Sequence, residues 1–201
     1  MPFNKTFLKV LVLGDVAVGK SSLAHRYVNR TFSYEYRVTI GADFLLKEIE
    51  YGDNEQITLQ IWDTAGQERY KAFNAPFYRG ADCAIIVFDI TDPLTFDHLE
   101  FWLKNLLENS QNEKIPIIVF GNRVDLKDLR EVSMQKAQLW CFSRNLKYFE
   151  TSAKTGENVE EAFDCLVKET LRHQNTIQVR ANHIILNNDK IRLEPDKNSC
   201  C

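Results

Sequence analysis

The chain has 201 residues, of which 44% are hydrophobic and 11% aromatic, so it is long enough to bury one substantial core and has no disordered or collagen-like composition. Its formal net charge of -3 gives no general electrostatic reason to expect a nucleic acid as partner. No apolar run approaches the roughly 18 residues that span a bilayer, and the start lacks the pattern of a signal peptide. We therefore expect one cytosolic domain with a tail.

Short apolar runs alternate with amphipathic stretches along the chain. The strand-like runs are 7–14, 43–51, 57–63, 82–90, 116–122 and 147–151, and helical periodicity occurs in 20–30, 96–109, 133–145 and 158–171. This order predicts an α/β fold with a six-stranded, mainly parallel sheet and about five flanking helices. The turn at 52–54 joins two strands directly, so one edge strand should be antiparallel. Beyond His173 the periodicity fades, which indicates a flexible tail.

A phosphate-binding pattern follows the first strand. Residues 14–21 read GDVAVGKS, which fits G-x-x-x-x-G-K-[ST] between a strand and a helix. Gly14 and Gly19 let the backbone curl so that its N–H groups point at phosphate oxygens. Lys20 is placed to bridge the β- and γ-phosphates, and the Ser21 hydroxyl to hold Mg²⁺.

A second motif, WDTAGQE at 62–68, ends the second strand of the predicted hairpin. It should therefore emerge beside the phosphate loop, at the carboxyl edge where doubly wound folds bind ligands. Asp63 is placed to reach a metal through water, and the Gly66 N–H to contact a γ-phosphate. Gln67 is placed to orient an attacking water.

Two further motifs, GNRVD at 121–125 and TSAK at 151–154, follow the last two strands. A carboxylate at Asp125 accepts from the two adjacent donors of guanine, whereas adenine would leave it unpaired. Sites of this type discriminate by roughly 10⁴ or more, so we expect guanine as the base. Asn122 should tie this loop to the phosphate loop, and the Ala153 N–H should face the guanine oxygen.

Taken in this order, the four motifs resemble those of the Ras superfamily of small GTPases over about residues 7–173. The segments IGADF, RYKAFN, FYRGA and IVFDIT look like those that set the Rab branch apart. FETSAK, the AQLWC stretch and the tail are similar to the late-endosomal branch of Rabs. The resemblance implies a single P-loop GTPase domain over residues 1–174 and a hypervariable tail over 175–201.

The resemblance also implies a role for each residue of the site. Gln67 and Lys20 would be catalytic, and Ser21, Thr39 and Asp63 would surround Mg²⁺. The effector-facing residues would be Ile40, Gly41, Phe44, Trp62 and Tyr78, with an ordinary core role as the alternative for the aromatic ones. The guanine nucleotide would contact Gly14, Val16, Ala17, Val18, Gly19, Lys20, Ser21, Ser22, Phe32, Tyr36, Thr39, Gly66, Asn122, Arg123, Asp125, Leu126, Ser152, Ala153 and Lys154.

Two departures from the family pattern matter for the cycle. Arg123 stands where the family has lysine, and because the exchange is not conservative, we expect weaker nucleotide binding and faster GDP release than in an Arg123→Lys variant. Val16 and Ala17 crowd the phosphate loop. The backbone cradle survives any side chain that avoids positive φ, but stiff Val16 would lie near the γ-phosphate and slow hydrolysis. The alternative is that switch II adjusts and Val16 is neutral.

The tail carries its own chemistry. Cys200 and Cys201 resemble the doubly geranylgeranylated terminus of Rabs, and two chains are what stable anchoring requires. From Thr176 onward there are four Lys or Arg against three Asp or Glu, so no polybasic patch assists. Ile191 and Leu193 form an apolar pair that resembles the tail motif bound by Rab escort protein.

These features together predict a monomeric Rab-type switch that hydrolyses GTP to GDP with Mg²⁺ and regulates vesicle trafficking. The implied partners are an activating protein, an exchange factor, Rab escort protein, GDP dissociation inhibitor and effectors, without nucleic acid. The expected location is the cytosol and the cytoplasmic face of a late endosomal, lysosomal or Golgi-related membrane. The alternatives are a near-constitutive GTP-bound scaffold and, less compatible with Asp125 and Ser152, an ATPase or nucleotide kinase.

Overall fold

The computed structural model describes residues 4–35, 38–51, 55–66, 77–110, 112 and 114–192. Its six strands form one sheet in the order β2-β3-β1-β4-β5-β6, in which only the β2–β3 pair is antiparallel. The predicted sheet, with its antiparallel edge strand, is therefore confirmed. The strands are β1 (Asn4–Gly14), β2 (Ala42–Tyr51), β3 (Glu55–Thr64), β4 (Cys83–Asp89), β5 (Ile117–Asn122) and β6 (Lys147–Thr151).

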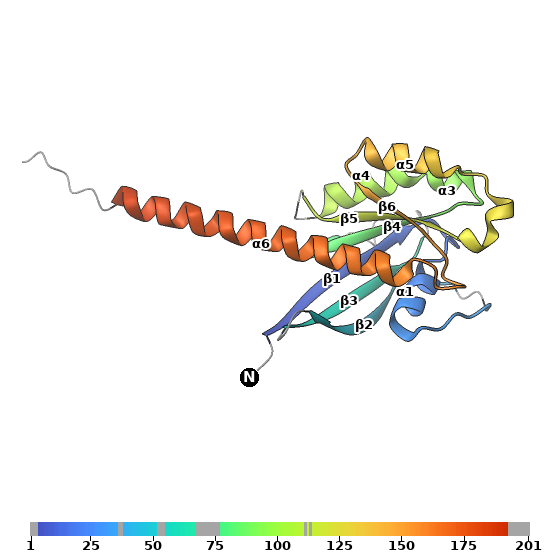
Figure 1. The fold of residues 1–201 in the computed structure, drawn as a ribbon, viewed down its shortest axis with the longest axis horizontal. Helices are drawn as coiled ribbons and strands as arrows, with labels where there is room; N and C mark the ends of the chain where they lie inside the picture. The colour runs from blue at the N-terminus through green and yellow to red at the C-terminus, as the bar shows by residue number, and fades with distance from the viewer. Residues whose placement is uncertain are drawn as a thin grey trace, which may run out of the picture.

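Helices cover both faces of this sheet (Figure 1). Helices α1 and α6 pack on one face, and α3, α4 and α5 pack on the other. A short 3₁₀ helix, η2, follows β5. In the described part of the chain the helices are α1 (Lys20–Asn29), α3 (Pro93–Asp97), α4 (Leu99–Asn109), η2 (Val124–Leu129), α5 (Met134–Phe142) and α6 (Val159–Arg192).

The central strands are largely apolar because they are buried on both faces. In β1, Val10 and Val12 pack into the core beneath α1 and α6, whereas Leu11 and Leu13 pack into the core beneath α3, α4 and α5. Successive strand residues point to opposite faces, so covering both faces requires apolar residues at every position. This requirement explains why the sequence shows continuous apolar runs instead of alternation.

The parallel strands end at one edge of the sheet. Asp89 at the end of β4 is in register with Asn122 of β5, which is in register with Thr151 of β6. The loops that leave these ends gather where doubly wound folds bind their ligands. All four sequence motifs begin at this edge.

Helix α6 is longer than the sequence pattern indicated. It continues past His173 to Arg192, and its C-terminal part leaves the body of the protein (Figure 1). The helix therefore extends beyond His173, where the helical periodicity of the sequence fades. The segment from residue 174 to 192 contains no proline or glycine that would interrupt the i→i−4 bonds. Among the described residues, no helix has the length and apolarity needed to cross a membrane.

We predict that Phe163→Ala lowers the free energy of unfolding by about 3–5 kcal/mol. Phe163 is fully buried on α6, stacks on Tyr27 of α1 with ring centroids 3.9 Å apart and meets Phe120 of β5 edge-on. Its removal leaves a cavity between the two helices and the sheet. Chemical denaturation measures the change.

The matched control is Phe142→Ala, because Phe142 is 84% exposed at the end of α5. We expect this variant to unfold within about 0.5 kcal/mol of wild type. Equal losses for the two phenylalanines would contradict the packing described for α6.

Candidate nucleotide site

The phosphate loop connects β1 to α1 with the predicted geometry. Gly14 has φ 137°, and a Cβ atom there would lie 2.2 Å from the carbonyl oxygen of Val87. Gly19 has φ 95° and immediately precedes the first residue of α1. Both positions therefore require glycine, the first for space and the second for backbone conformation.

Ala17 departs from what we expected. Its φ is 63°, in the left-handed region, although it carries a Cβ atom. The condition given above for an intact backbone cradle, that side chains in this loop avoid positive φ, is therefore not met at Ala17. A non-glycine residue in such a conformation costs about 1–3 kcal/mol and persists only where the surroundings hold it.

Lys20 is buried at the start of α1. Its Nζ donates to the carbonyl oxygen of Asp15 at 2.6 Å. Burial lowers the pKa of Lys20 to about 8, and the carboxylates of Asp63 and Asp15 oppose that shift. A buried ammonium group beside an anion-binding loop is a ready counter-charge for a phosphate.

The three residues predicted to hold Mg²⁺ come together from different elements. The Thr39 hydroxyl lies 2.9 Å from the Ser21 hydroxyl and donates to Asp63 Oδ2 at 3.3 Å, and Ser21 also donates to that oxygen. Asp63 is 1% exposed, its Oδ1 has no hydrogen-bond partner among the described residues, and burial raises its pKa. A buried, unpartnered carboxylate oxygen among hydroxyl oxygens fits a hard cation such as Mg²⁺.

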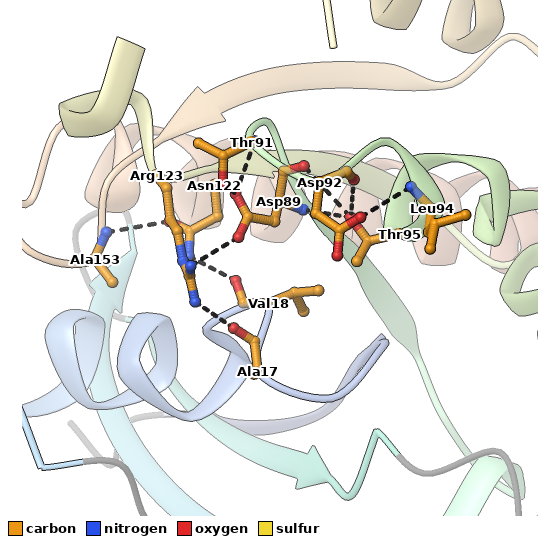
Figure 2. A network of polar contacts seen from close by, with 10 residues as sticks. All are labelled: Ala17, Val18, Asp89, Thr91, Asp92, Leu94, Thr95, Asn122, Arg123 and Ala153. Carbon is orange, nitrogen blue, oxygen red and sulfur yellow. Dashed lines mark hydrogen bonds and ion pairs between the residues drawn. The ribbon is translucent and has the colours of Figure 1, made fainter. Parts of the chain in front are cut away.

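Asn122 joins the base-recognition loops to the phosphate loop, as predicted. Its Nδ2 donates to the Val18 carbonyl at 2.8 Å, and its Oδ1 accepts from the Ala153 N–H at 3.2 Å (Figure 2). The Ser152 hydroxyl donates to Asp125 Oδ1 at 2.6 Å. This bond fixes the orientation of the carboxylate that we expect to recognise guanine.

Arg123 reaches the phosphate loop from the end of β5. Its Nη2 donates to the Ala17 carbonyl at 2.5 Å, and its Nη1 lies 2.8 Å from Asp89 Oδ2 (Figure 2). The guanidinium therefore has two acceptors in the positions that its planar fork requires. This geometry argues against the loosened site that we expected from the exchange of lysine for arginine.

A cavity of about 680 Å³ lies between these loops, within the range of sizes that accommodate small-molecule ligands. It is lined by many of the residues predicted to contact the nucleotide, which are Val16, Ala17, Gly19, Lys20, Ser21, Ser22, Phe32, Thr39, Gly66, Asn122, Arg123, Asp125, Leu126, Ala153 and Lys154. Gly14, Val18 and Ser152 support its walls without lining it.

The cavity also has lining residues that sequence reasoning missed. They are His25, Thr31, Ser33, Tyr34, Glu35 and Val38. Except for His25, they belong to the segment between α1 and β2. In that segment, the aromatic residues were the only ones whose type indicated a place in the nucleotide site. Phe32 and Tyr34 pack edge to face with ring centroids 5.2 Å apart, and Lys154 Nζ lies 5.7 Å from the centre of the Tyr34 ring.

The predicted effector-facing residues divide into two groups. Ile40 is 93% exposed, and Phe44 is exposed on β2, where it packs edge-on against Trp62 of β3 with centroids 5.3 Å apart. Gly41, with φ 75°, leads into β2. Tyr78 is only 4% exposed and belongs to the core beneath α3, α4 and α5. The expectation that it faces an effector is therefore not met, and the core role given as the alternative describes it.

Several predicted residues lie outside the described residues. They are Tyr36, Gln67, Leu193, Cys200 and Cys201. Gly66, which precedes Gln67, packs tightly against the peptide between Asp15 and Val16, because a Cβ atom on it would lie 2.3 Å from the Asp15 carbonyl carbon. The roles predicted for Gln67 and Tyr36 stay predictions.

Comparison with known proteins agrees with this geometry. Residues 9–172 match the Ras family. The chain belongs to the Ras family. It is 50% identical over 175 residues to the Ras-related protein RABG3f of Arabidopsis thaliana, covering 84% of each chain. It is 49% identical over 177 residues to the Ras-related protein Rab7 of Cenchrus ciliaris, covering 85% of each, and 49% identical over 175 residues to Rab7 of Pisum sativum, covering 84% of each.

These similarities confirm the expected assignment to the late-endosomal branch of Rab GTPases. The protein is therefore a small GTPase that binds guanine nucleotide, hydrolyses GTP to GDP and acts as a switch in endosomal membrane trafficking. Family membership excludes the ATPase and nucleotide kinase alternatives. It also favours a hydrolysing switch over a scaffold that remains bound to GTP.

We predict that Asp125→Asn moves the base preference of this GTPase from guanine to xanthine. Xanthine presents a carbonyl where guanine has its amino group, and an asparagine amide can donate to it. The loss of discrimination should approach the roughly 10⁴ that an unpaired polar group in such a site costs. Competition of GDP and xanthosine diphosphate for the protein measures it.

Asp128→Asn is the matched control, because Asp128 is an exposed carboxylate on the same 3₁₀ helix, η2. It should keep the guanine preference of wild type. Unchanged guanine selectivity in Asp125→Asn would rule out this carboxylate as the base reader.

Proposed function

We propose that Ser21, Thr39 and Asp63 form the Mg²⁺ site of this GTPase and that closure of Thr39 over the metal is the switching step. The observation that carries the proposal is the unpartnered Oδ1 of Asp63, buried beside two hydroxyl groups from other elements. When bound, the cation would neutralise charge that develops on the phosphates. Lys20 and the loop N–H groups hold the same phosphates from the other side.

The same segments carry the surface that we propose effectors read. Thr39 is followed by exposed Ile40 and by Gly41, whose carbonyl accepts from the Ala65 N–H at 2.8 Å. Ala65 precedes Gly66, the residue proposed to contact the γ-phosphate. A change at the phosphate end of the site therefore reaches Ile40 and Phe44 through a short path of covalent and hydrogen bonds.

The proposed cycle also needs partners and a membrane. We propose that an activating protein supplies a catalytic arginine while Gln67 places the attacking water, and that an exchange factor removes GDP. The tail from residue 175 would deliver the monomeric protein, through Rab escort protein and GDP dissociation inhibitor, to the cytoplasmic face of a late endosomal or lysosomal membrane. A Golgi-related membrane is the second candidate location.

We predict that Val16→Gly and Val16→Ser hydrolyse GTP faster than wild type, by up to about 100-fold. Val16 lines the cavity, and its β-branched side chain is stiff at χ1. A displacement of Gln67 by about 1 Å costs on the order of 100-fold, or roughly 2.7 kcal/mol in the barrier. Single-turnover hydrolysis, with and without an activating protein, measures the rates.

The assay uses a saturating protein concentration with Mg²⁺, so that the rate reports chemistry instead of binding, and a parallel sample with EDTA tests the metal. EDTA should stop turnover of wild type. If all three proteins cleave GTP at one rate, Val16 does not hinder hydrolysis. If EDTA leaves the rate unchanged, the proposed metal site is wrong.

We predict that membrane attachment requires geranylgeranyl groups on both Cys200 and Cys201. Each buried CH₂ contributes about 0.8 kcal/mol, and a single chain gives only reversible binding. Because the tail has no polybasic patch to compensate, Cys201→Ser should move the protein largely into the soluble fraction of a cell lysate. Cys165→Ser, which changes a thiol on α6 within the domain, is the control and should fractionate like wild type. Full membrane retention of Cys201→Ser would require an anchor elsewhere.

A further inference from the structure

Ala17 and Arg123, one residue from each of the two departures from the family pattern, contact each other. They lie far apart in the sequence, yet Arg123 Nη2 donates to the Ala17 carbonyl at 2.5 Å (Figure 2). Ala17 also has a left-handed φ of 63°, and Arg123 itself has a φ of 74°. The only side-chain bond that the structure gives to this carbonyl, within the described residues, therefore comes from the other unusual residue of the site.

Arg123 is itself anchored on its far side. Its Nη1 lies 2.8 Å from Oδ2 of Asp89, a buried carboxylate at the end of β4. The other oxygen of Asp89 accepts from the N–H and the hydroxyl of Thr91 at 2.9 and 2.7 Å. The carboxylate is thus held by its own loop, and the guanidinium spans the gap from this fixed point to the phosphate loop (Figure 2).

Two consecutive carbonyls of the phosphate loop are held from the β5 end. Asn122 holds the Val18 carbonyl, and Arg123 holds the Ala17 carbonyl. Because each peptide plane is rigid, fixing a carbonyl also fixes the N–H of the following residue on the opposite side of the plane. The directions of the amides that face the phosphates therefore depend on these two side chains.

We propose that Arg123, anchored by Asp89, is a positioning residue that holds Ala17 in its left-handed conformation, so that the two departures form a compensating pair. A lysine at this position would present one nitrogen, whereas the arginine fork presents two in fixed geometry to two acceptors. The inference rests on the nucleotide-binding function described above. From the sequence we expected Arg123 to speed GDP release. The proposal states the opposite, that Arg123 slows GDP release as long as residue 17 is alanine.

The test is a double-mutant cycle on the rate of GDP release. Wild type, Arg123→Lys, Ala17→Gly and the double variant are loaded with a fluorescent GDP analogue in Mg²⁺ and chased with unlabelled GDP. We expect Arg123→Lys to accelerate release about 10-fold in the wild-type background and clearly less in the background that carries Ala17→Gly, since glycine adopts positive φ without support.

A second variant tests the anchor at Asp89, and a control variant measures the general cost of exchanging arginine for lysine. Asp89→Asn removes the anchor and should also accelerate release, again less when combined with Ala17→Gly. Arg144→Lys is the control for the general cost of the exchange, because Arg144 pairs with Glu100 away from the site, and its effect should be the same in both backgrounds. A thermal unfolding curve for each variant identifies any that fail to fold.

The results distinguish a failure of the Ala17–Arg123 pairing from a failure of nucleotide binding. Equal acceleration by Arg123→Lys in both backgrounds, or slower release, would overturn the pairing while leaving GDP binding intact. A wild-type chain that does not retain the GDP analogue would overturn the nucleotide-binding function and the pairing together.

Discussion

The buried amide of Asn122 is the constraint on which the rest of the site depends. It binds the phosphate loop through Val18 and the base loop through Ala153, and its backbone carbonyl accepts from Ile90 after β4. Gly19 must lack a side chain because a Cβ atom there would lie 2.3 Å from the Asn122 amide nitrogen. Loss of this amide would leave the Val18 carbonyl and the Ala153 N–H without this partner, at about 1–3 kcal/mol each.

The site also buries two ionisable side chains, which packing alone would leave exposed to water. Lys20 and Asp63 are both buried, and burial shifts the pKa of each toward its neutral form, downward for Lys20 and upward for Asp63. Folding therefore keeps a pair of desolvated groups that lack full compensation from the protein. Such incomplete compensation is typical of a site that gains its missing charges from a ligand, which fits the guanine nucleotide and the Mg²⁺ ion proposed above.

The sequence predicted those features that local patterns encode. Continuous apolar runs identified the strands, and motifs directly after them placed Asn122 and Asp63 correctly, because parallel strands end at one edge. The left-handed conformation of Ala17 and its contact with Arg123 were not predictable, since they depend on how two distant loops meet. The sequence left an effector-facing role and a core role open for Tyr78, because a family role says nothing about which face an aromatic residue takes in the fold.

The position of β2 at the edge of the sheet has a consequence for solubility. Exposed Phe44 and Leu46 on this strand would make it a template for pairing with another chain. Exposed Glu48 and Glu50 lie on the same strand, and charged side chains on an edge strand disfavour its pairing with another chain. The edge that carries the proposed effector-facing residues is thus protected by its own charges against self-association.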